Sequence, residues 1–227
     1  MTDYGNVDFC RSRWELGFGQ SYRVIPNIIF GKAPTVAFRV RHDITRSVGI
    51  QTERAIFLIN GTQGAGKSTV ARALARRFER GACIDADDLL RLVVSGAASL
   101  EPPLSSDAEH QLRLRARVAS QLADTFFEAG FTVAISEIVV GRLDHFRVDI
   151  KSRPLLLVNL VPSLDTVKRR NEERLNKNVF EPWSPILDRA IRDTMSGIGL
   201  WLDNSNQTLD ETVNDILLHA WNAGTLE

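Results

Sequence analysis

Cysteine and histidine are scarce in this chain, which has two cysteines and four histidines among 227 residues. Cys10 and Cys83 cannot build a disulfide framework, and the histidines and carboxylates lack the spacing of a structural zinc site. No apolar run approaches the roughly 18 residues that span a bilayer, and the N-terminus lacks the apolar core of a signal peptide. We therefore predict a cytoplasmic protein with reduced thiols, no structural metal and no membrane segment.

An excess of one charge sign is also missing, because 28 Lys and Arg residues balance 28 Asp and Glu residues. A neutral chain gives no strong signal for nucleic-acid binding. The length suits one domain, and the 44% of hydrophobic residues suits a globular core. Residues 1–54 show little sustained periodicity. We therefore predict an irregular N-terminal extension over residues 1–54 and a single domain over residues 55–227.

Residues 61–68 have the spacing G-x-x-x-x-G-K-[ST], which is the phosphate-binding loop (P-loop) of nucleotide hydrolases and kinases. The glycines allow consecutive backbone N–H groups to surround a phosphate without a Cβ in the way. Lys67 is expected to reach the β- and γ-phosphates, and the hydroxyl of Ser68 to bind Mg²⁺. The sequence thus predicts ATP and Mg²⁺ as ligands. The predicted ATP-binding residues are Gly61, Thr62, Gln63, Gly64, Ala65, Gly66, Lys67, Ser68 and Thr69.

The P-loop lies between an apolar run at residues 55–60 and a helical pattern at residues 67–79. In that helix an apolar stripe faces away from three arginines; the two sets are Val70, Leu74, Phe78 and Arg72, Arg76, Arg80. Strand and helix patterns then alternate, which is typical of a parallel sheet with crossover helices. We predict an α/β, three-layer P-loop NTPase fold, with a five-stranded parallel sheet flanked by helices and a small helical lid. The strands are expected at residues 55–60, 82–85, 131–136, 154–160 and 198–202.

A long helix is expected over residues 107–129, after a proline-containing segment from Ser95 to Asp107 that we interpret as a loop over the site. Its predicted inward residues are Leu112, Ala116, Ala119, Leu122, Ala123 and Phe126. The motif Pro182-Trp183-Ser184-Pro185 is expected to break the chain before another helix, and the last helix is expected at residues 208–222.

Carboxylates follow the second and third predicted strands, whose ends meet the P-loop at one edge of the sheet. Asp85 is expected to hold Mg²⁺ through water, and Asp87 to accept the proton of the acceptor hydroxyl. The alternative is that Asp87 or Asp88 caps the next helix. Glu137 ends an apolar strand, which predicts a place near the metal or the substrate, although many strands end in an acid. Arg142 is a candidate substrate contact, but the favoured interpretation of this position is a solvated loop arginine.

The segment from Val167 to Lys177 carries Arg170 and Arg174 on one helical face, followed by Lys177. Such a row suits a lid in which Arg170 and Arg174 stabilise charge on the transferring phosphoryl group. The alternative is a solvated helix with Glu–Arg pairs. The position after the fourth strand favours the lid.

Residues 55–222 resemble the small P-loop kinases of the nucleoside-monophosphate-kinase-like group, and most closely the chloramphenicol phosphotransferase-like family. The family's general-base setting is matched by residues 86–89, and its basic lid spacing by Arg170, Arg174 and Lys177. The Asp-x-Asp of related shikimate, gluconate and adenylylsulfate kinases is matched by Asp85 and Asp87. The family's third strand ends in several acids, whereas Glu137 is a single acid here. Residues 1–54 have no counterpart.

The expected function is ATP- and Mg²⁺-dependent phosphorylation of a hydroxyl on a small molecule, such as an antibiotic or other secondary metabolite. One alternative is a kinase of a nucleoside, a polynucleotide end or a nucleotide sugar, as in zeta-type toxins. Another is a nucleotide switch that transfers no phosphate. Guanine-reading and transporter-ATPase signatures are missing from the sequence.

Overall fold

A parallel β-sheet forms the centre of the protein in the computed structural model, which describes residues 53–101, 103–173 and 183–226. The five parallel strands follow the order β2-β3-β1-β4-β5, so β1 lies in the middle between β3 and β4. Their bounds are β1 Ile56–Gly61, β2 Gly81–Asp85, β3 Thr132–Ser136, β4 Leu155–Leu160 and β5 Leu200–Leu202. The predicted extension at residues 1–54 lies almost wholly outside the described residues, as do Arg174 and Lys177, and the domain boundary stays a prediction.

The sheet has a sixth strand that the sequence analysis did not predict. This strand is β6 (Thr225–Leu226), and it pairs antiparallel with β4. Leu226 lies opposite Leu155 and is buried in the core, which explains why the chain returns to the sheet here. Two residues are too few to give a period-2 pattern, so the sequence contained no signal for this strand.

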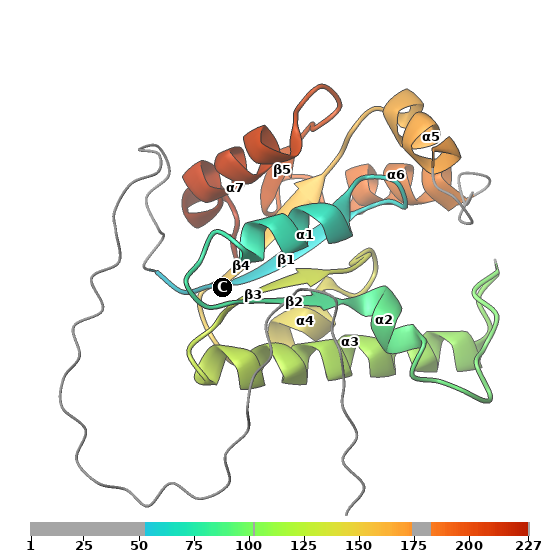
Figure 1. Ribbon diagram of the computed structural model, residues 1–227. Helices are drawn as coiled ribbons and strands as arrows, with labels where there is room; N and C mark the ends of the chain where they lie inside the picture. The colour runs from blue at the N-terminus through green and yellow to red at the C-terminus, as the bar shows by residue number, and fades with distance from the viewer. Residues whose placement is uncertain (1–52, 102, 174–182, 227) are drawn as a thin grey trace, which may run out of the picture. The chain divides into compact units, whose positions relative to one another are not determined.

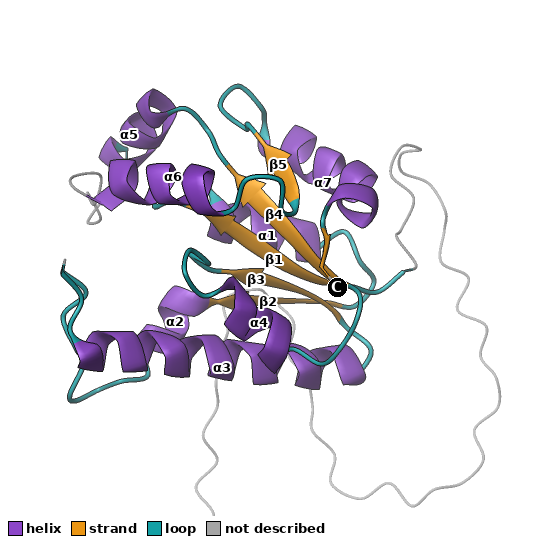
Figure 2. Cartoon of the chain, turned by 180° about the vertical axis from the view of Figure 1, so that it is seen from behind, coloured by secondary structure: helices purple, strands orange, loops and turns teal. Residues whose placement is uncertain are grey.

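The described chain has seven helices, which lie around the sheet (Figures 1 and 2). Helices α1 and α7 pack on one face, and α3 and α4 on the other, whereas α2, α5 and α6 lie toward the end at which the parallel strands finish. Their bounds are α1 Lys67–Ala75, α2 Ala86–Leu90, α3 Ser106–Glu128, α4 Leu143–Asp149, α5 Leu164–Glu172, α6 Trp183–Thr194 and α7 Leu209–Ala223.

The side chains of β1 alternate between two cores because successive residues of a strand point to opposite faces. Phe57 and Ile59 join the core beneath α1 and α7, whereas Ile56 and Leu58 join the core above α3 and α4. Every residue of β1 and of β4 is buried, as expected for central strands covered on both faces. These rigid strands fix the positions of the loops at their carboxyl ends.

The predicted helical stripes are largely confirmed. In and after α1 the three predicted inward residues are buried and the three predicted outward arginines are exposed. On α3 the prediction for Phe126 is wrong, because its side chain is 39% exposed and its ring contacts Phe131 edge-on near the helix end. Helix α4 was not expected from the sequence. Helix α6 begins at Trp183 and includes Pro185, since a proline in the first turn removes no helical hydrogen bond.

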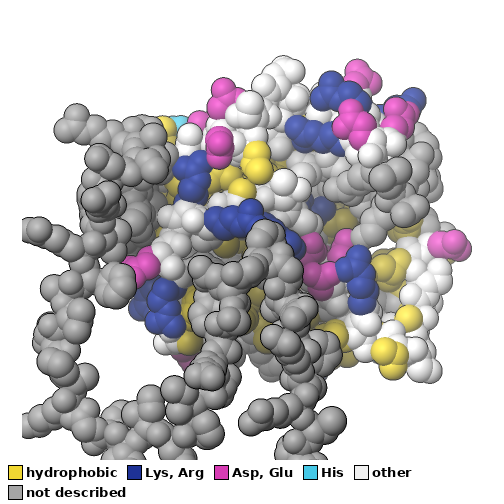
Figure 3. Space-filling view, viewed as in Figure 1, with side chains coloured by type: hydrophobic (Ala, Val, Ile, Leu, Met, Phe, Trp, Pro, Cys, Tyr) yellow, Lys and Arg dark blue, Asp and Glu magenta, His cyan; other side chains and the backbone are white. Residues whose placement is uncertain are grey.

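Acidic and basic side chains are interspersed over the face formed by α1 and α7 (Figure 3). Arg77, after α1, pairs with Asp210 of α7 at 3.0 Å. Among the described helices, none combines the length and apolar composition that crossing a bilayer requires.

Candidate functional site

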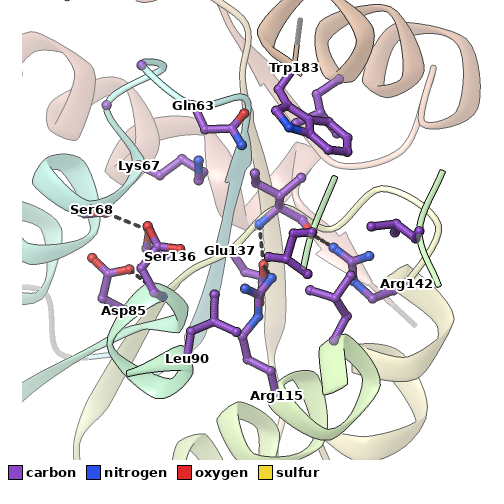
Figure 4. Close-up of a pocket in the computed structure, with 18 residues that line it drawn as sticks. Gln63, Lys67, Ser68, Asp85, Leu90, Arg115, Ser136, Glu137, Arg142 and Trp183 are labelled. Atoms are coloured by element: carbon purple, nitrogen blue, oxygen red, sulfur yellow. Dashed lines mark hydrogen bonds and ion pairs between the residues drawn. The ribbon is translucent and has the colours of Figure 1, made fainter. Parts of the chain in front are cut away.

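A cavity of about 350 Å³ opens at the carboxyl ends of β1, β2 and β3 (Figure 4). Several elements contribute to its wall: the P-loop, the start of α2, the loop before α3, α3 itself, the segment after β3 and the start of α6. Leu100 and Leu104 of the loop before α3 line it, which confirms the prediction of a loop over the site. A cavity of this size, with apolar walls and a few charged groups, is typical of a small-molecule site.

The P-loop has the backbone geometry that an anion cradle requires. Gly64 and Gly66 have φ values of 86° and 96°, in the left-handed region where a Cβ is strained. Gly66 is the N-cap of α1, so the positive end of that helix dipole faces the loop. The Lys67 ammonium donates to the Thr62 carbonyl oxygen at 2.9 Å and lines the cavity. This arrangement fits a bound phosphate chain.

Two carbonyl groups of the P-loop are held from outside by α5, α6 and the loop after β5. The Gln63 oxygen accepts from Asn171 Nδ2 at 3.4 Å and from Ser184 Oγ at 3.3 Å. The Ala65 oxygen accepts from Arg170 Nη1 at 3.3 Å and from Asn204 Nδ2 at 3.2 Å. In a trans peptide the N–H points opposite to the C=O. The contacts to the Gln63 and Ala65 oxygens therefore direct the backbone N–H groups of Gly64 and Gly66 away from the side chains that bind these oxygens.

Asn171 is closely packed against the P-loop. It is fully buried, and a Cβ added to Gly64 would lie only 2.6 Å from its Nδ2 atom. We expect Asn171→Ala to lower the free energy of unfolding by roughly 1–2 kcal/mol, because a buried amide is lost from a packed site. The variant should also bind MgATP more weakly, since the loop loses one of its supports. Chemical denaturation and calorimetric ATP titration measure the two effects.

The matched control for this prediction is Asn214→Ala, because Asn214 is exposed on α7. Equal ATP affinity in wild type and Asn171→Ala would show that the loop keeps its shape without this contact.

The end of β2 and the end of β3 bring polar groups to the P-loop serine. Asp85 lies opposite Ser136 in the sheet, and Ser136 Oγ is 3.1 Å from Ser68 Oγ. Asp85 also accepts the Asp87 backbone N–H at 3.2 Å and is thereby the N-cap of α2. The alternative in which Asp87 or Asp88 caps this helix is therefore wrong. Asp87 is exposed and lines the cavity, while Asp88 pairs with Arg91 on the surface.

Glu137 forms a buried ion pair with Arg115 of α3. The distance from Arg115 Nη2 to Glu137 Oε1 is 2.6 Å, and the two side chains are 7% and 2% exposed. The same Oε1 atom accepts the Ile138 N–H at 2.8 Å. Burial raises the pKa of Glu137, while Arg115 and then Arg142 oppose that rise. Glu137 thus lies at the cavity with one arginine as its direct partner.

Arg142 is half-buried at the start of α4 and donates from Nη2 to the Ile138 oxygen at 2.7 Å. Burial lowers its pKa, the nearby Glu137 carboxylate raises it, and Arg115 lowers it. Because the side chain is half-buried and lines the cavity, the favoured interpretation of a solvated loop arginine is wrong.

The predicted lid arginines have different outcomes. Arg170 binds the outside of the P-loop through Ala65 O and reaches Asn204 O at 2.9 Å. Burial lowers its pKa, and Arg169 adds to that effect. Arg174 lies outside the described residues, so the lid and the role of Arg170 in transfer stay predictions.

The sequence did not identify Arg115, Ser136, Asn171, Trp183 and Asn204, which the structure brings to the P-loop or the cavity. Arg115 carried one available signal: it falls three residues after Leu112 and one before Ala116, on the inward face of its helix. A charged residue on an apolar stripe requires a buried partner, and Glu137 is that partner.

A magnesium site was predicted at Ser68 and Asp85, and the donors present fit that ion. The described residues contain no cluster of three or more His, Cys, Asp or Glu side chains arranged for a metal. Mg²⁺ in phosphate-transfer sites takes few protein ligands, because waters and substrate phosphates complete its shell. Ser68 beside the Asp85–Ser136 pair supplies that kind of partial site.

Comparison with known proteins gives a family and a fold. A family model described as an AAA domain matches residues 57–181, which is more than half of the chain. Among curated proteins, none matches the sequence.

Several solved kinase structures are similar in fold. The APS kinase CysC from Mycobacterium tuberculosis, in complex with AMPPNP and APS, has 18% identity and a TM-score of 0.51, covering 72% of this chain and 95% of that one. The shikimate kinase from Acinetobacter baumannii has 20% identity and a TM-score of 0.50, covering 73% and 92%. A gluconokinase from Sinorhizobium meliloti has 23% identity and a TM-score of 0.50, also covering 73% and 92%. These likenesses confirm the predicted P-loop kinase fold.

Proposed function

The chain belongs to the AAA domain family, and from this membership together with its cavity we propose an ATP- and Mg²⁺-dependent phosphotransferase that acts on a hydroxyl of a small molecule. One observation carries the proposal: Lys67, Ser68 and Asp87 line the same cavity as a set of apolar side chains. In this proposal Lys67 binds the phosphates, Ser68 binds the metal, and Asp87 accepts the proton of the acceptor hydroxyl. The apolar wall of the cavity contacts the body of the acceptor. The similarity in fold to the APS, shikimate and gluconate kinases named above supports this assignment.

The transfer itself needs positioning and charge stabilisation more than covalent chemistry. The acceptor hydroxyl oxygen forms a bond to the γ-phosphorus, the bond from that phosphorus to the β–γ bridging oxygen breaks, and ADP leaves with the electron pair. Asp87 accepts the hydroxyl proton, which leaves the phosphate ester as product. Bound Mg²⁺, held by Ser68 and through water by Asp85, would neutralise charge on the β- and γ-phosphates. The amides after Gln63 and Ala65 and the Lys67 ammonium orient the phosphate chain.

The apolar wall favours a compact, partly apolar acceptor, as for the chloramphenicol phosphotransferase-like family that the sequence resembles. Leu90, Leu104 and Trp183 are among the residues that face the cavity. A screen of hydroxylated compounds for ATP-dependent phosphate incorporation tests the assignment. We expect phosphate to enter at least one class of alcohol with wild-type protein. ATP binding with hydrolysis to water alone, and no transfer to any alcohol, would favour the nucleotide switch.

Arg170→Ala and Arg174→Ala test the lid. Both are expected to lower kcat more than they raise the dissociation constant of ATP, because a lid arginine meets the phosphoryl group as its charge redistributes. Steady-state kinetics and ATP titration separate the two quantities. Arg169→Ala is the matched control, since Arg169 is exposed on the same helix. Arg170 also holds the Ala65 oxygen. A weaker ATP affinity with unchanged kcat would thus make it a support of the P-loop instead of a lid residue.

A further inference from the structure

The side of the cavity remote from the P-loop serine carries one more positive charge than negative charge. Arg115 and Arg142 both line this region, and both guanidinium groups are protonated at neutral pH. Glu137 is the acid between them, and it pairs directly with Arg115. Within the described chain no carboxylate lies at ion-pair distance from Arg142. The two guanidinium groups therefore share the single carboxylate of Glu137, and a partly buried site with an uncompensated positive charge is costly.

Both guanidinium groups also keep unused donors. The only hydrogen bond of Arg142 to a described residue is the one from Nη2 to the Ile138 oxygen, and that of Arg115 is the one from Nη2 to Glu137. The Nη1 groups of both residues therefore have no partner among the residues that the structure describes. An anion in the cavity would supply acceptors for these donors. Charge-assisted bonds of this kind are the stronger hydrogen bonds of proteins.

The geometry separates this cationic side from the phosphate side. Figure 4 shows Arg142 across the cavity from Lys67, Ser68 and Asp85, with Glu137 between them. Apolar side chains line the same cavity, among them Leu90, Leu104, Ile138 and Trp183. A ligand that satisfies all three regions has a hydroxyl at one end, an apolar body and an anion at the other end.

Resting on the phosphotransferase function proposed above, we propose that the acceptor is a hydroxylated carboxylic acid with an apolar body, whose carboxylate is bound by Arg142 together with Arg115. The hydroxyl then points toward Asp87 and the γ-phosphate. Arg142 fixes the orientation of the acceptor and takes no part in bond making. The charge count selects the anion: two arginines and one glutamate leave a single positive charge, which a carboxylate neutralises. A phosphate or phosphonate dianion would instead leave a negative charge in a partly buried site.

The test uses aromatic and alicyclic primary alcohols in matched sets, such as 3- and 4-(hydroxymethyl)benzoate, the corresponding carboxamides and the corresponding phosphonates. Transfer from radiolabelled ATP gives kcat/KM for each probe. Calorimetry with a non-hydrolysable ATP analogue present gives binding of the same probes without turnover. Loss of a charge-assisted pair corresponds to a roughly 10- to 100-fold loss of affinity. In wild type, kcat/KM and affinity should therefore be higher by that factor for the carboxylates than for their carboxamides.

Three variants locate the effect. Arg142→Gln should abolish the preference for carboxylates, mainly through KM, while leaving MgATP affinity unchanged. Arg142→Lys should retain part of the preference, because it keeps the charge but loses the fork of donors. Arg117→Gln is the control, since Arg117 is exposed on α3 two residues from Arg115. Thermal unfolding of each variant shows whether a loss comes from the site or from the fold.

The possible outcomes separate this inference from the function on which it rests. Equal transfer to carboxamides and carboxylates would overturn the anion site and keep the phosphotransferase. Tighter binding of phosphonates than of carboxylates would overturn the single-charge argument. Preferential binding of carboxylates that depends on Arg142, without any transfer, would support the anion site and overturn the phosphotransferase. Binding of no carboxylate probe, while MgATP binds normally, would overturn the anion site.

Discussion

Lys67→Ala should reduce phosphoryl transfer by on the order of 10³-fold or more and weaken ATP binding, while the protein remains folded. The Lys67 ammonium lines the cavity and lies 2.9 Å from the Thr62 oxygen, at the open side of the P-loop. Its positive charge counteracts the negative charge of the β- and γ-phosphates. This electrostatic attraction is strongest where water is excluded from the site. Steady-state kinetics, ATP titration and chemical denaturation measure the three quantities.

Lys151→Ala is the control for this change, because Lys151 is exposed and precedes β4 at the opposite end of the sheet. Loss of the hydrogen bond from Lys67 to the Thr62 oxygen is expected to lower the free energy of unfolding by about 0.5–1.5 kcal/mol, which is the usual net worth of such a bond. Unchanged turnover in Lys67→Ala would refute the phosphotransferase assignment.

Asp87→Asn is expected to keep ATP affinity and lose most of the catalytic rate, by roughly 10²–10⁴-fold, as is typical for removal of a general base. Asp87 lies in the first turn of α2, exposed to the cavity, and its backbone N–H is bound by the Asp85 carboxylate. This bond fixes the turn that presents the Asp87 side chain. Asparagine preserves the size of the side chain but cannot accept a proton at neutral pH. Single-turnover kinetics at saturating ATP isolates the chemical step.

The neighbouring aspartates provide matched comparisons. Asp88→Asn should be nearly silent, because Asp88 pairs with Arg91 on the surface. Asp85→Asn keeps a residue that caps helices well, so it should spare the fold and act through Mg²⁺ dependence. A crippled Asp85→Asn or Asp88→Asn beside an active Asp87→Asn would mean that the base has been misassigned.

The sequence determined those features that depend on short-range spacing. The P-loop was recognisable because phosphate binding requires glycines, a lysine and a serine or threonine at fixed spacing within eight residues. Residues 61–68 have that spacing. The central strands were recognisable because burial on both faces requires continuous apolar runs, as in β1 and β4. The apolar stripe of α1 was recognisable because one face of that helix packs on the sheet. The fold class followed from the alternation of such elements.

Tertiary structure alone decided how distant residues meet. The sequence could not pair Arg115 with Glu137, because the two are 22 positions apart and only the packing of α3 against the sheet brings them together. The hold of Asn171 and Asn204 on the P-loop carbonyls is also a contact between segments more than 100 residues apart in the chain. Strand β6 joins the sheet because the side chain of Leu226 is buried beside β4. Local pattern encodes which face of an element is apolar, whereas the identity of the neighbour on that face is set by the order in which strands and helices pack.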